Sequence, residues 1–386
     1  MAEMADLFDV LRASLFTDED VSLPDWEPVF EEMVLQTVAA LPGEWLASHL
    51  DAEPWRLYCR MEQAEWTRVM HAQDGLLRLL EAHGIPCVIL KGAAAAMAYP
   101  HPTLRSMGDV DCLVKRADFE RTAALLEANG YAEKYDKELA TQHYSYTRDG
   151  VTIELHRRTP LVAETDEEWL ALFEAGIDAR EWHETEGHRF PTLPPALNGL
   201  VLLLHINHHL RSGLGLRQIV DWMMYVHALP ANTRSELRAL LEDAGQTRLA
   251  QTVTLLCQRY LGLETVVGED DSLPVDGLLA HILEKGNFGQ KVGIDGKIAE
   301  VGLASTEPGG FFRRLQDGGM TRWSAARKHA ALRPFAWLYQ AFRIAGILLM
   351  TKKSPREILS QRRHGAEQRR LFDALGLELN GTIRRR

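Results

Sequence analysis

The sequence has little of what marks disulfide-stabilised, membrane-spanning or repetitive proteins. Its 386 residues include 4 cysteines, scattered and without a Cys-x-x-Cys pair, which we interpret as small apolar residues in a reducing compartment. The opening residues carry no basic segment and no apolar run, so no secretory signal is expected there. The sequence also shows no internal repeat and no low-complexity segment. These absences favour a globular protein, with the cytoplasm as the expected compartment.

The longest apolar stretch, residues 332–350, is interrupted by Arg333, Gln340 and Arg343. An arginine near the middle of a membrane would cost on the order of 3 kcal/mol, which argues against a spanning segment. We therefore predict an amphipathic helix over this stretch and no transmembrane segment.

Charge is distributed unevenly along the chain. The net charge is −11, yet residues 321–386 hold about 15 Lys or Arg against about 4 Asp or Glu. Such a basic tail can bind nucleic acid, an acidic membrane surface or an acidic partner. No interleaved aromatic residues or known nucleic-acid module accompany it, so we favour a solvated face that balances an acidic body. Its basic runs are Lys352-Lys353, Arg362-Arg363, Arg369-Arg370 and Arg384-Arg385-Arg386.

A chain of this length with 46% apolar residues can bury a sizeable core and is expected to form two or more domains. Apolar spacing predicts helices through residues 1–84 and again beyond Pro195, with breaks near 286–296 and 307–310. Strands and helices alternate between them. The strands 142–148 and 151–156 are joined by Asp149-Gly150, a strong two-residue hairpin signal. The predicted domains are 1–84, 85–194, 195–305 and a basic, mostly helical region 306–386.

Two aspartates flank one apolar residue in Gly108-Asp109-Val110-Asp111-Cys112-Leu113. In a strand, Asp109 and Asp111 share one face while Val110 and Cys112 pack against the other. Adjacent carboxylates repel each other unless a cation lies between them, and hard divalent ions such as Mg²⁺ prefer oxygen ligands. Alone, the pattern is weak, because such triplets also occur on solvated edges.

A possible phosphate site precedes the aspartates. Residues 86–91 read as a short buried strand, Gly92 follows, and the alanine-rich stretch 93–98 is typical of a helix. A strand, a glycine turn and a helix N-terminus together present backbone N–H groups to an anion.

In combination these motifs resemble the nucleotidyltransferases of the DNA polymerase beta-like superfamily, in particular a bacterial branch of uncharacterised nucleotidyltransferases. The resemblance covers roughly residues 75 to 230. It implies an α+β fold, with a small mixed sheet flanked by helices at 85–194 and helical regions on either side. The matching segments are Leu90-Lys91-Gly92-Ala93, Tyr99-Pro100, the run 104–114, Gly130-Tyr131 and Ile153-Glu154-Leu155-His156.

The resemblance also implies site residues. Gly92 and its neighbours Lys91 and Ala93 would lie on the nucleotide phosphates, and Asp109 and Asp111 would hold two metal ions. The ions would be Mg²⁺, with Mn²⁺ as an alternative, and Glu154 would supply a third carboxylate. Ala93 departs from the wider superfamily, which usually has Ser or Gly there, and the gap from Gly92 to Asp109 is long. Both features leave the donor NTP open, with ATP among the candidates.

Three further residues flank the proposed phosphates. Arg105 could clamp phosphate oxygens with its two-pronged guanidinium. Lys91 could reach phosphate or pair with an aspartate. His156 shares a face with Glu154 and could act as a base, contact the nucleotide or form a structural hydrogen bond.

Histidines cluster in a later helix. His205 and His209 are one helical turn apart and could supply two ligands of a zinc site, but no third ligand lies at a spacing typical of such sites. A polar stripe facing the nucleotide is the favoured interpretation, with His205 and Arg217 as nucleotide contacts. Asp221 either pairs with Arg217 on the helix surface or, by the resemblance to antibiotic nucleotidyltransferases, acts as the catalytic base.

The leading hypothesis is a Mg²⁺-dependent enzyme that moves an NMP from an NTP to a hydroxyl or phosphate acceptor and releases pyrophosphate. The acceptor would be a small molecule, a peptide or a protein. Phosphoryl transfer on the same scaffold and a non-catalytic nucleotide-binding protein are the alternatives. The intact set Asp109, Asp111 and Glu154 argues against loss of catalysis. The acceptor and the oligomeric state are left open.

Overall fold

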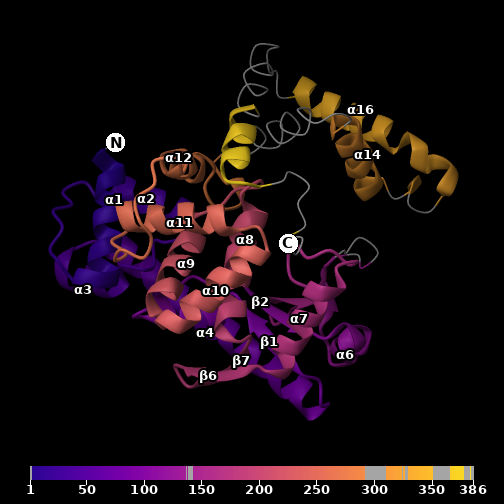
Figure 1. The fold of residues 1–386 in the computed structure, drawn as a ribbon, viewed down its shortest axis with the longest axis horizontal. Coiled ribbons are helices and arrows are strands. Elements are labelled where there is room, and N and C mark those ends of the chain that lie inside the picture. The colour runs from indigo at the N-terminus through magenta and orange to yellow at the C-terminus, as the bar shows by residue number, and fades with distance from the viewer. Residues whose placement is uncertain are drawn as a thin grey trace.

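The structure is a computed structural model that describes residues 2–135, 137, 142–291, 310–323, 325–326, 329–350, 366–377 and 383. The first part of the chain is helical, as predicted, and ends in the long helix α4 (Glu53–Ala82), which packs against the sheet (Figure 1). Its elements are α1 (Ala2–Arg12), the π-helical turn η1 (Ala13–Thr17), α2 (Glu27–Leu35), α3 (Gly43–His49) and α4 (Glu53–Ala82).

A mixed five-stranded sheet follows, with strand order β1-β2-β5-β4-β3. Strands β2 and β5 are parallel, and the other neighbouring pairs are antiparallel. The predicted α+β class with a small mixed sheet is therefore confirmed. The elements in chain order are β1 (Cys87–Leu90), α5 (Gly92–Ala96), the 3-10 turn η2 (Pro102–Leu104), β2 (Asp109–Val114), α6 (Arg116–Ala128), β3 (Ala132–Glu133), β4 (His143–Arg148) and β5 (Val151–His156).

The hairpin between β4 and β5 forms where the sequence predicts it. Asp149 and Gly150 both have positive φ, 52° and 76°, as a type I′ turn requires. This turn fixes the register that places Ser145 opposite Glu154 and His143 opposite His156. The strand that carries Glu154 thereby lies between β4 and the strand of the two aspartates.

The sheet separates two hydrophobic cores because side chains alternate between its faces. One face packs on α4 and α6 through Val110, Cys112, Ile153 and Leu155. The other face carries Asp109, Asp111, Glu154 and His156 toward α5, α8 and α9, with Val88, Leu90 and Leu113 joining the second core. The alternation predicted for the Asp-x-Asp strand is confirmed.

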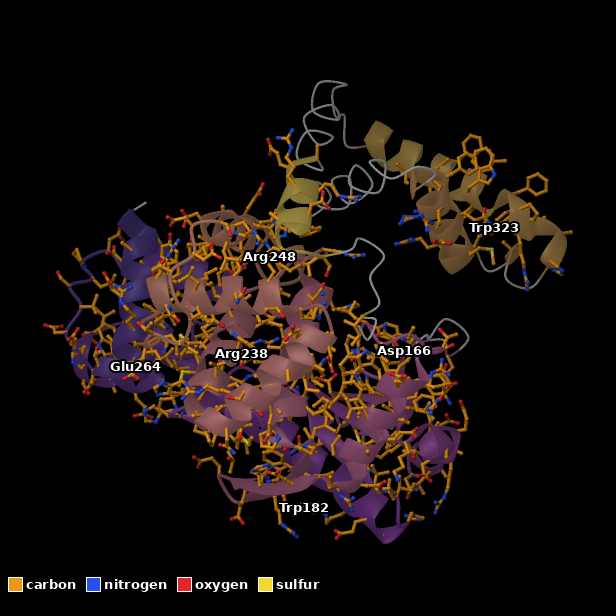
Figure 2. All side chains as sticks on the ribbon, viewed as in Figure 1. Asp166, Trp182, Arg238, Arg248, Glu264 and Trp323 are labelled. Atoms are coloured by element: carbon orange, nitrogen blue, oxygen red, sulfur yellow. The ribbon has the colours of Figure 1, made fainter. Side chains whose placement is uncertain are left out.

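A second, two-stranded sheet was not predicted from the sequence. Asp166 caps the N-terminus of helix α7 (Glu167–Asp178), and its Oδ1 accepts a hydrogen bond from the backbone N of Trp169 at 3.4 Å. The strands β6 (Glu181–Thr185) and β7 (His188–Thr192) then pair through a turn in which Glu186 has φ 52°. Figure 2 labels Asp166 at the start of α7 and Trp182 on this hairpin.

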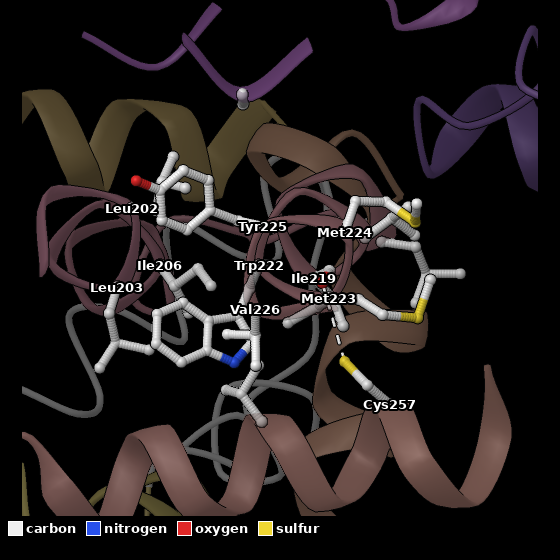
Figure 3. Packing of buried hydrophobic residues seen from close by; sticks show 14 of the residues in the cluster. Leu202, Leu203, Ile206, Ile219, Trp222, Met223, Met224, Tyr225, Val226 and Cys257 are labelled. Atoms are coloured by element: carbon white, nitrogen blue, oxygen red, sulfur yellow. Dashed lines mark hydrogen bonds between the residues drawn. The ribbon is translucent and has the colours of Figure 1, made fainter. Parts of the chain in front are cut away.

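Helices dominate the chain from Pro195 onward, as expected. Helix α9 packs against α8 and α11, and its residues Ile219, Trp222 and Met223 are buried (Figure 3). The Cys257 thiol on α11 lies 3.8 Å from the Ile219 carbonyl oxygen. The elements are α8 (Pro195–His209), α9 (Leu216–Ala228), α10 (Ala231–Asp243), α11 (Thr247–Tyr260), α12 (Val275–Lys285) and the 3-10 turn η4 (Asn287–Gly289).

Further along the chain lie α14 (Gly310–Arg322), the 3-10 segment η5 (Ala330–Phe335) and α16 (Ala336–Met350). Helices α14 and α16 pack on each other, with Trp323, labelled in Figure 2, stacked on Tyr339 at 5.4 Å between ring centroids. The helix predicted over 332–350 thus begins at Ala336, after a 3-10 segment that contains Pro334. Among the described helices, none has both the length and the apolar character needed to cross a membrane.

Several earlier expectations fall on residues that lie outside the described ranges. These are the basic runs Lys352-Lys353, Arg362-Arg363 and Arg384-Arg385-Arg386, and most of the two predicted breaks, namely 292–296 and 307–309. Arg369 and Arg370 lie in a described helical segment, where Arg369 Nε contacts Asp373 Oδ1 at 3.0 Å. The role of the basic tail and the four domain limits stay predictions.

Candidate active site

Three carboxylates converge at the boundary between two parallel strands. The register of β2 and β5 places Asp111 directly beside Glu154, and Asp109 lies two residues earlier on the same face. One oxygen from each of Asp109, Asp111 and Glu154 lies within 4.8 Å of the others. An all-oxygen set of this size fits a hard divalent cation such as Mg²⁺ or Mn²⁺.

Two cationic side chains compensate the charge of Asp111, which is almost fully buried. Lys91 Nζ lies 2.7 Å and His156 Nε2 lies 2.9 Å from Asp111 Oδ1. Burial alone would raise the pKa of Asp111, but Lys91 and His156 outweigh it and hold that pKa well below its usual range. The pKa of Asp109 is raised, because burial and the neighbouring Asp111 charge both disfavour its ionised form.

Lys91 therefore pairs with an aspartate, one of the two alternatives that the sequence left open. Burial would lower the pKa of Lys91, but Asp111, Asp109 and Glu154 together raise it. The backbone at Lys91 has φ 50° and ψ −131°, a conformation that is costly for any residue with a Cβ. Such strain persists where surrounding structure demands it, often at functional sites.

The glycine turn lies where the sequence places it, after the buried strand β1. Gly92 lines the cavity described below and begins α5. The Ala93 side chain is 1% exposed and belongs to the sheet core, so a ligand at this turn meets only its backbone. Phosphate contact by Lys91, Gly92 or Ala93 stays a prediction.

The imidazole N–H of His156 points toward two of the carboxylates as a hydrogen-bond donor. Its Nε2 lies 2.9 Å from Asp111 Oδ1 and 3.4 Å from Glu154 Oε2. Burial would lower the pKa of His156, but the bonds to Asp111 and Glu154 outweigh it and raise that pKa. The structural role that the sequence left open is thus present, while a role as base stays a prediction.

Arg105 and Asp221 form a buried ion pair that links the loop before β2 to helix α9. Arg105 Nε and Nη2 donate to the two oxygens of Asp221 at 3.0 and 2.7 Å, and the Tyr99 hydroxyl donates to Oδ1 at 2.7 Å. Burial would raise the pKa of Asp221, but Arg105 outweighs it and lowers that pKa. The guanidinium expected to clamp phosphate and the carboxylate expected to act as a base are therefore bonded to each other.

Arg217 is the cation on α9 that faces the cavity. Its Nη1 donates to the Ser106 carbonyl oxygen at 3.0 Å, and its buried Nε has no partner within the described part of the chain. Burial lowers the pKa of Arg217, and the nearby Arg105 lowers it further. The predicted surface pair between Arg217 and Asp221 is not formed, since Asp221 bonds to Arg105 and Tyr99.

The N-terminus of α9 is held by the end of α2. Gln36 Oε1 accepts a hydrogen bond from the backbone N of Leu216 at 3.2 Å, and the Gln36 carbonyl accepts one from the backbone N of Arg217 at 3.3 Å. These contacts satisfy two of the unpaired N–H groups that open a helix. The N-terminal helical region thereby fixes the position of Arg217 over the site.

The histidine cluster on α8 lines the same cavity, as the polar-stripe interpretation predicts. The rings of His205 and His209 lie 4.3 Å apart, and those of His208 and His209 lie 5.2 Å apart. Neither of the two candidate metal groups found among the described residues contains them. Burial is the main cause that lowers the pKa of His209 to about 3, followed by His208 and Lys91.

This histidine makes stability depend on pH. Because the folded protein disfavours protonated His209, the unfolded chain binds the proton first once pH falls below about 6.5. We expect the free energy of unfolding to fall between about pH 6.5 and about pH 4.5, and to fall less in His209→Gln. Denaturant titrations at both pH values measure this difference, and equal pH slopes in the two proteins would contradict it.

His143 is a residue of the site that was not predicted from the sequence. It pairs with His156 across β4 and β5, and its Nε2 lies 3.5 Å from Glu154 Oε1. His143, Glu154 and His156 form the second group of described residues whose ligand atoms lie within 4.8 Å of one another. The signal was available, because a hairpin of known register places residue 143 opposite residue 156.

Most of these side chains line one cavity of about 550 Å³, a volume typical of small-molecule sites. Sheet, loop and helices each contribute to its wall. The predicted site residues that line it are Lys91, Gly92, Arg105, Asp109, Asp111, Glu154, His156, His205, Arg217 and Asp221.

The model of the protein family described as "Uncharacterised nucleotidyltransferase" matches residues 30–262 of the sequence. The chain belongs to this family. The match confirms the resemblance and extends it beyond residues 75–230 on both sides. The protein is thus a nucleotidyltransferase, an enzyme whose substrates include a nucleoside triphosphate.

Among solved structures, the nucleotidyltransferase is similar to an antigenic nucleotidyltransferase-like protein from Paracoccidioides brasiliensis. The two are 16% identical with a TM-score of 0.31, over 47% of this chain and 91% of that chain. No curated protein matches the sequence.

Proposed function

We propose that this nucleotidyltransferase moves an NMP from an NTP to a hydroxyl or phosphate group and releases pyrophosphate. The observation that supports the proposal most strongly is the group Asp109, Asp111 and Glu154 on two paired strands, facing a cavity with cationic walls. Family membership gives the reaction class, and this geometry supports the three carboxylates as the site of the reaction.

The three carboxylates are proposed to hold Mg²⁺ or Mn²⁺. When bound, such ions neutralise phosphate charge and stabilise an in-line displacement at phosphorus. Until then Lys91 and His156 compensate Asp111 by direct contact. This arrangement keeps Asp111 ionised at neutral pH, as a metal ligand must be.

Different cationic side chains are proposed to bind different parts of the triphosphate. Lys91 and the Gly92 turn lie at the carboxylate end of the cavity, and Arg217 enters from α9. Arg217 makes one side-chain hydrogen bond within the described residues, so its remaining N–H groups are available to phosphate oxygens. We assign phosphate binding to Arg217 in place of Arg105.

Arg105 and Asp221 are proposed as positioning residues. Both Asp221 oxygens accept hydrogen bonds from Arg105, and its lowered pKa makes it a weak proton acceptor. Arg105 Nη1 also donates to the Ser106 carbonyl oxygen, at 3.1 Å, which is the same oxygen that Arg217 contacts. The pair thus anchors the loop that receives Arg217.

The test determines which phosphate of the donor NTP is transferred to the acceptor. The protein is incubated with Mg²⁺ and NTP labelled at the α- or the γ-phosphate, together with small-molecule and protein fractions of a cell extract. We expect α-label to enter an acceptor and γ-label to leave as pyrophosphate. Transfer of γ-label alone would show phosphoryl transfer, and binding without transfer of either label would show a non-catalytic protein.

A further inference from the structure

An aromatic ring lies at the rim of the cavity in the segment after α12. Phe288 lines the cavity and is 57% exposed. Its backbone has φ 52° and ψ 25°, the left-handed region that residues with bulky side chains rarely adopt. An exposed aromatic ring on a costly backbone conformation indicates a function for the ring beyond packing.

Neighbouring contacts hold this segment firmly. The backbone N of Phe288 donates to the Gly213 carbonyl oxygen at 3.1 Å. Gly213 has φ 122°, and a Cβ there would come within 2.0 Å of the Gly289 backbone N, so no other residue fits this approach. Lys285 Nζ, just before the segment, donates to the Arg211 carbonyl oxygen at 2.8 Å. The ring is therefore presented by a fixed backbone, which lowers the entropy cost of binding against it.

The Phe288 ring belongs to a row of rings that includes two histidines of α8. The Phe288 ring lies 5.1 Å from that of His209, which lies 4.3 Å from that of His205. Phe288, these histidines and the three carboxylates all line the same cavity.

Amide groups accompany the ring. Gln218 is 3% exposed, lines the cavity, and donates from Nε2 to Asn287 Oδ1 at 3.2 Å. Its Oε1 is buried and has no partner among the described residues. An aromatic face next to an unpaired amide acceptor is the chemistry that recognises a planar heterocycle with N–H donors.

We propose that Phe288 is the stacking platform for the nucleobase of the donor NTP, with Gln218 accepting a hydrogen bond from the nucleoside. This inference rests on the nucleotidyl transfer proposed above, because it places the triphosphate at Lys91 and Arg217. Residue 288 lies outside the residues 30–262 that match the family, so the platform is assigned from this chain's own structure.

The test separates base binding from phosphate binding. Affinities for ATP, CTP and inorganic tripolyphosphate are measured by calorimetry with Mg²⁺ for the full chain and for Phe288→Ala and Phe288→Tyr. We expect Phe288→Ala to weaken both nucleotides roughly 5- to 150-fold and tripolyphosphate less than about twofold. Phe288→Tyr keeps a ring and is expected to bind like the wild type. Phe335→Ala, at a phenylalanine that is 53% exposed and outside the cavity, is the matched control.

The outcomes distinguish the two proposals. Wild-type protein that binds neither nucleotide nor tripolyphosphate would overturn nucleotidyl transfer and the platform with it. Normal wild-type binding with unchanged affinity in Phe288→Ala would overturn the platform alone. Equal weakening of tripolyphosphate and nucleotides would also overturn it, because the ring would then act on the fold of the site.

Discussion

Replacing Asp109 with asparagine is expected to lower the rate of NMP transfer roughly a thousandfold, equal to about 4 kcal/mol of activation barrier. Asparagine keeps the shape of the side chain but removes the negative charge that a divalent cation requires. Asp109 carries no ion pair among the described residues, unlike Asp111 with Lys91, so the substitution leaves no cation unpaired. The loss is therefore one of function rather than of folding.

The measurement compares kcat and the Mg²⁺-dependent thermal shift produced by NTP. Asp149→Asn is the matched control, because this aspartate lies in the β4–β5 turn with its side chain 89% exposed. Asparagine also tolerates the positive φ at that position. If Asp109→Asn kept both kcat and the metal-dependent thermal shift, the proposed metal site at Asp109 would be wrong.

Asp221→Asn is expected to lower the free energy of unfolding by about 3–5 kcal/mol. The carboxylate and the Arg105 guanidinium are 6% and 4% exposed, so removing one charge leaves the other buried without compensation. Tyr99 would lose its charged acceptor at the same time. Denaturant unfolding measures the change, and Asp20→Asn, at an exposed position in the segment before α2, serves as a control with a change of about 0.5 kcal/mol or less.

A double substitution separates structural from catalytic roles. Arg105→Met with Asp221→Leu replaces the pair by apolar groups and is expected to recover most of the stability that Asp221→Asn loses. If Asp221 is instead the base, Asp221→Asn would keep its stability and lose the acidic limb of the pH–rate profile. That result would return the catalytic role to Asp221.

Local pattern was enough to predict the strands that build the site. Alternation assigned Asp109 and Asp111 to one face, and the Asp149-Gly150 turn set the hairpin that carries Glu154. Each of these signals acts within a few residues, where backbone geometry and turn chemistry decide the structure. The resemblance to a family then supplied the third carboxylate, and the strand register brings it beside Asp111.

Contacts between distant segments could not be predicted in the same way. Arg105 and Asp221 are 116 residues apart, and nothing near either residue indicates the other. Phe288 is held at the cavity by a backbone hydrogen bond to Gly213, in the loop between α8 and α9. The β6–β7 hairpin was missed because Glu186-Gly187 is a weaker turn signal than Asp149-Gly150. Tertiary packing decides all three.

A crystal structure with Mn²⁺ and a non-hydrolysable NTP analogue tests the central claim most directly, because anomalous scattering locates the metal. The account predicts anomalous peaks in contact with Asp109, Asp111 and Glu154, with the α-phosphate of the analogue beside them and Arg217 on the triphosphate. Peaks elsewhere, or the γ-phosphate in place of the α-phosphate at these carboxylates, would contradict nucleotidyl transfer at this site.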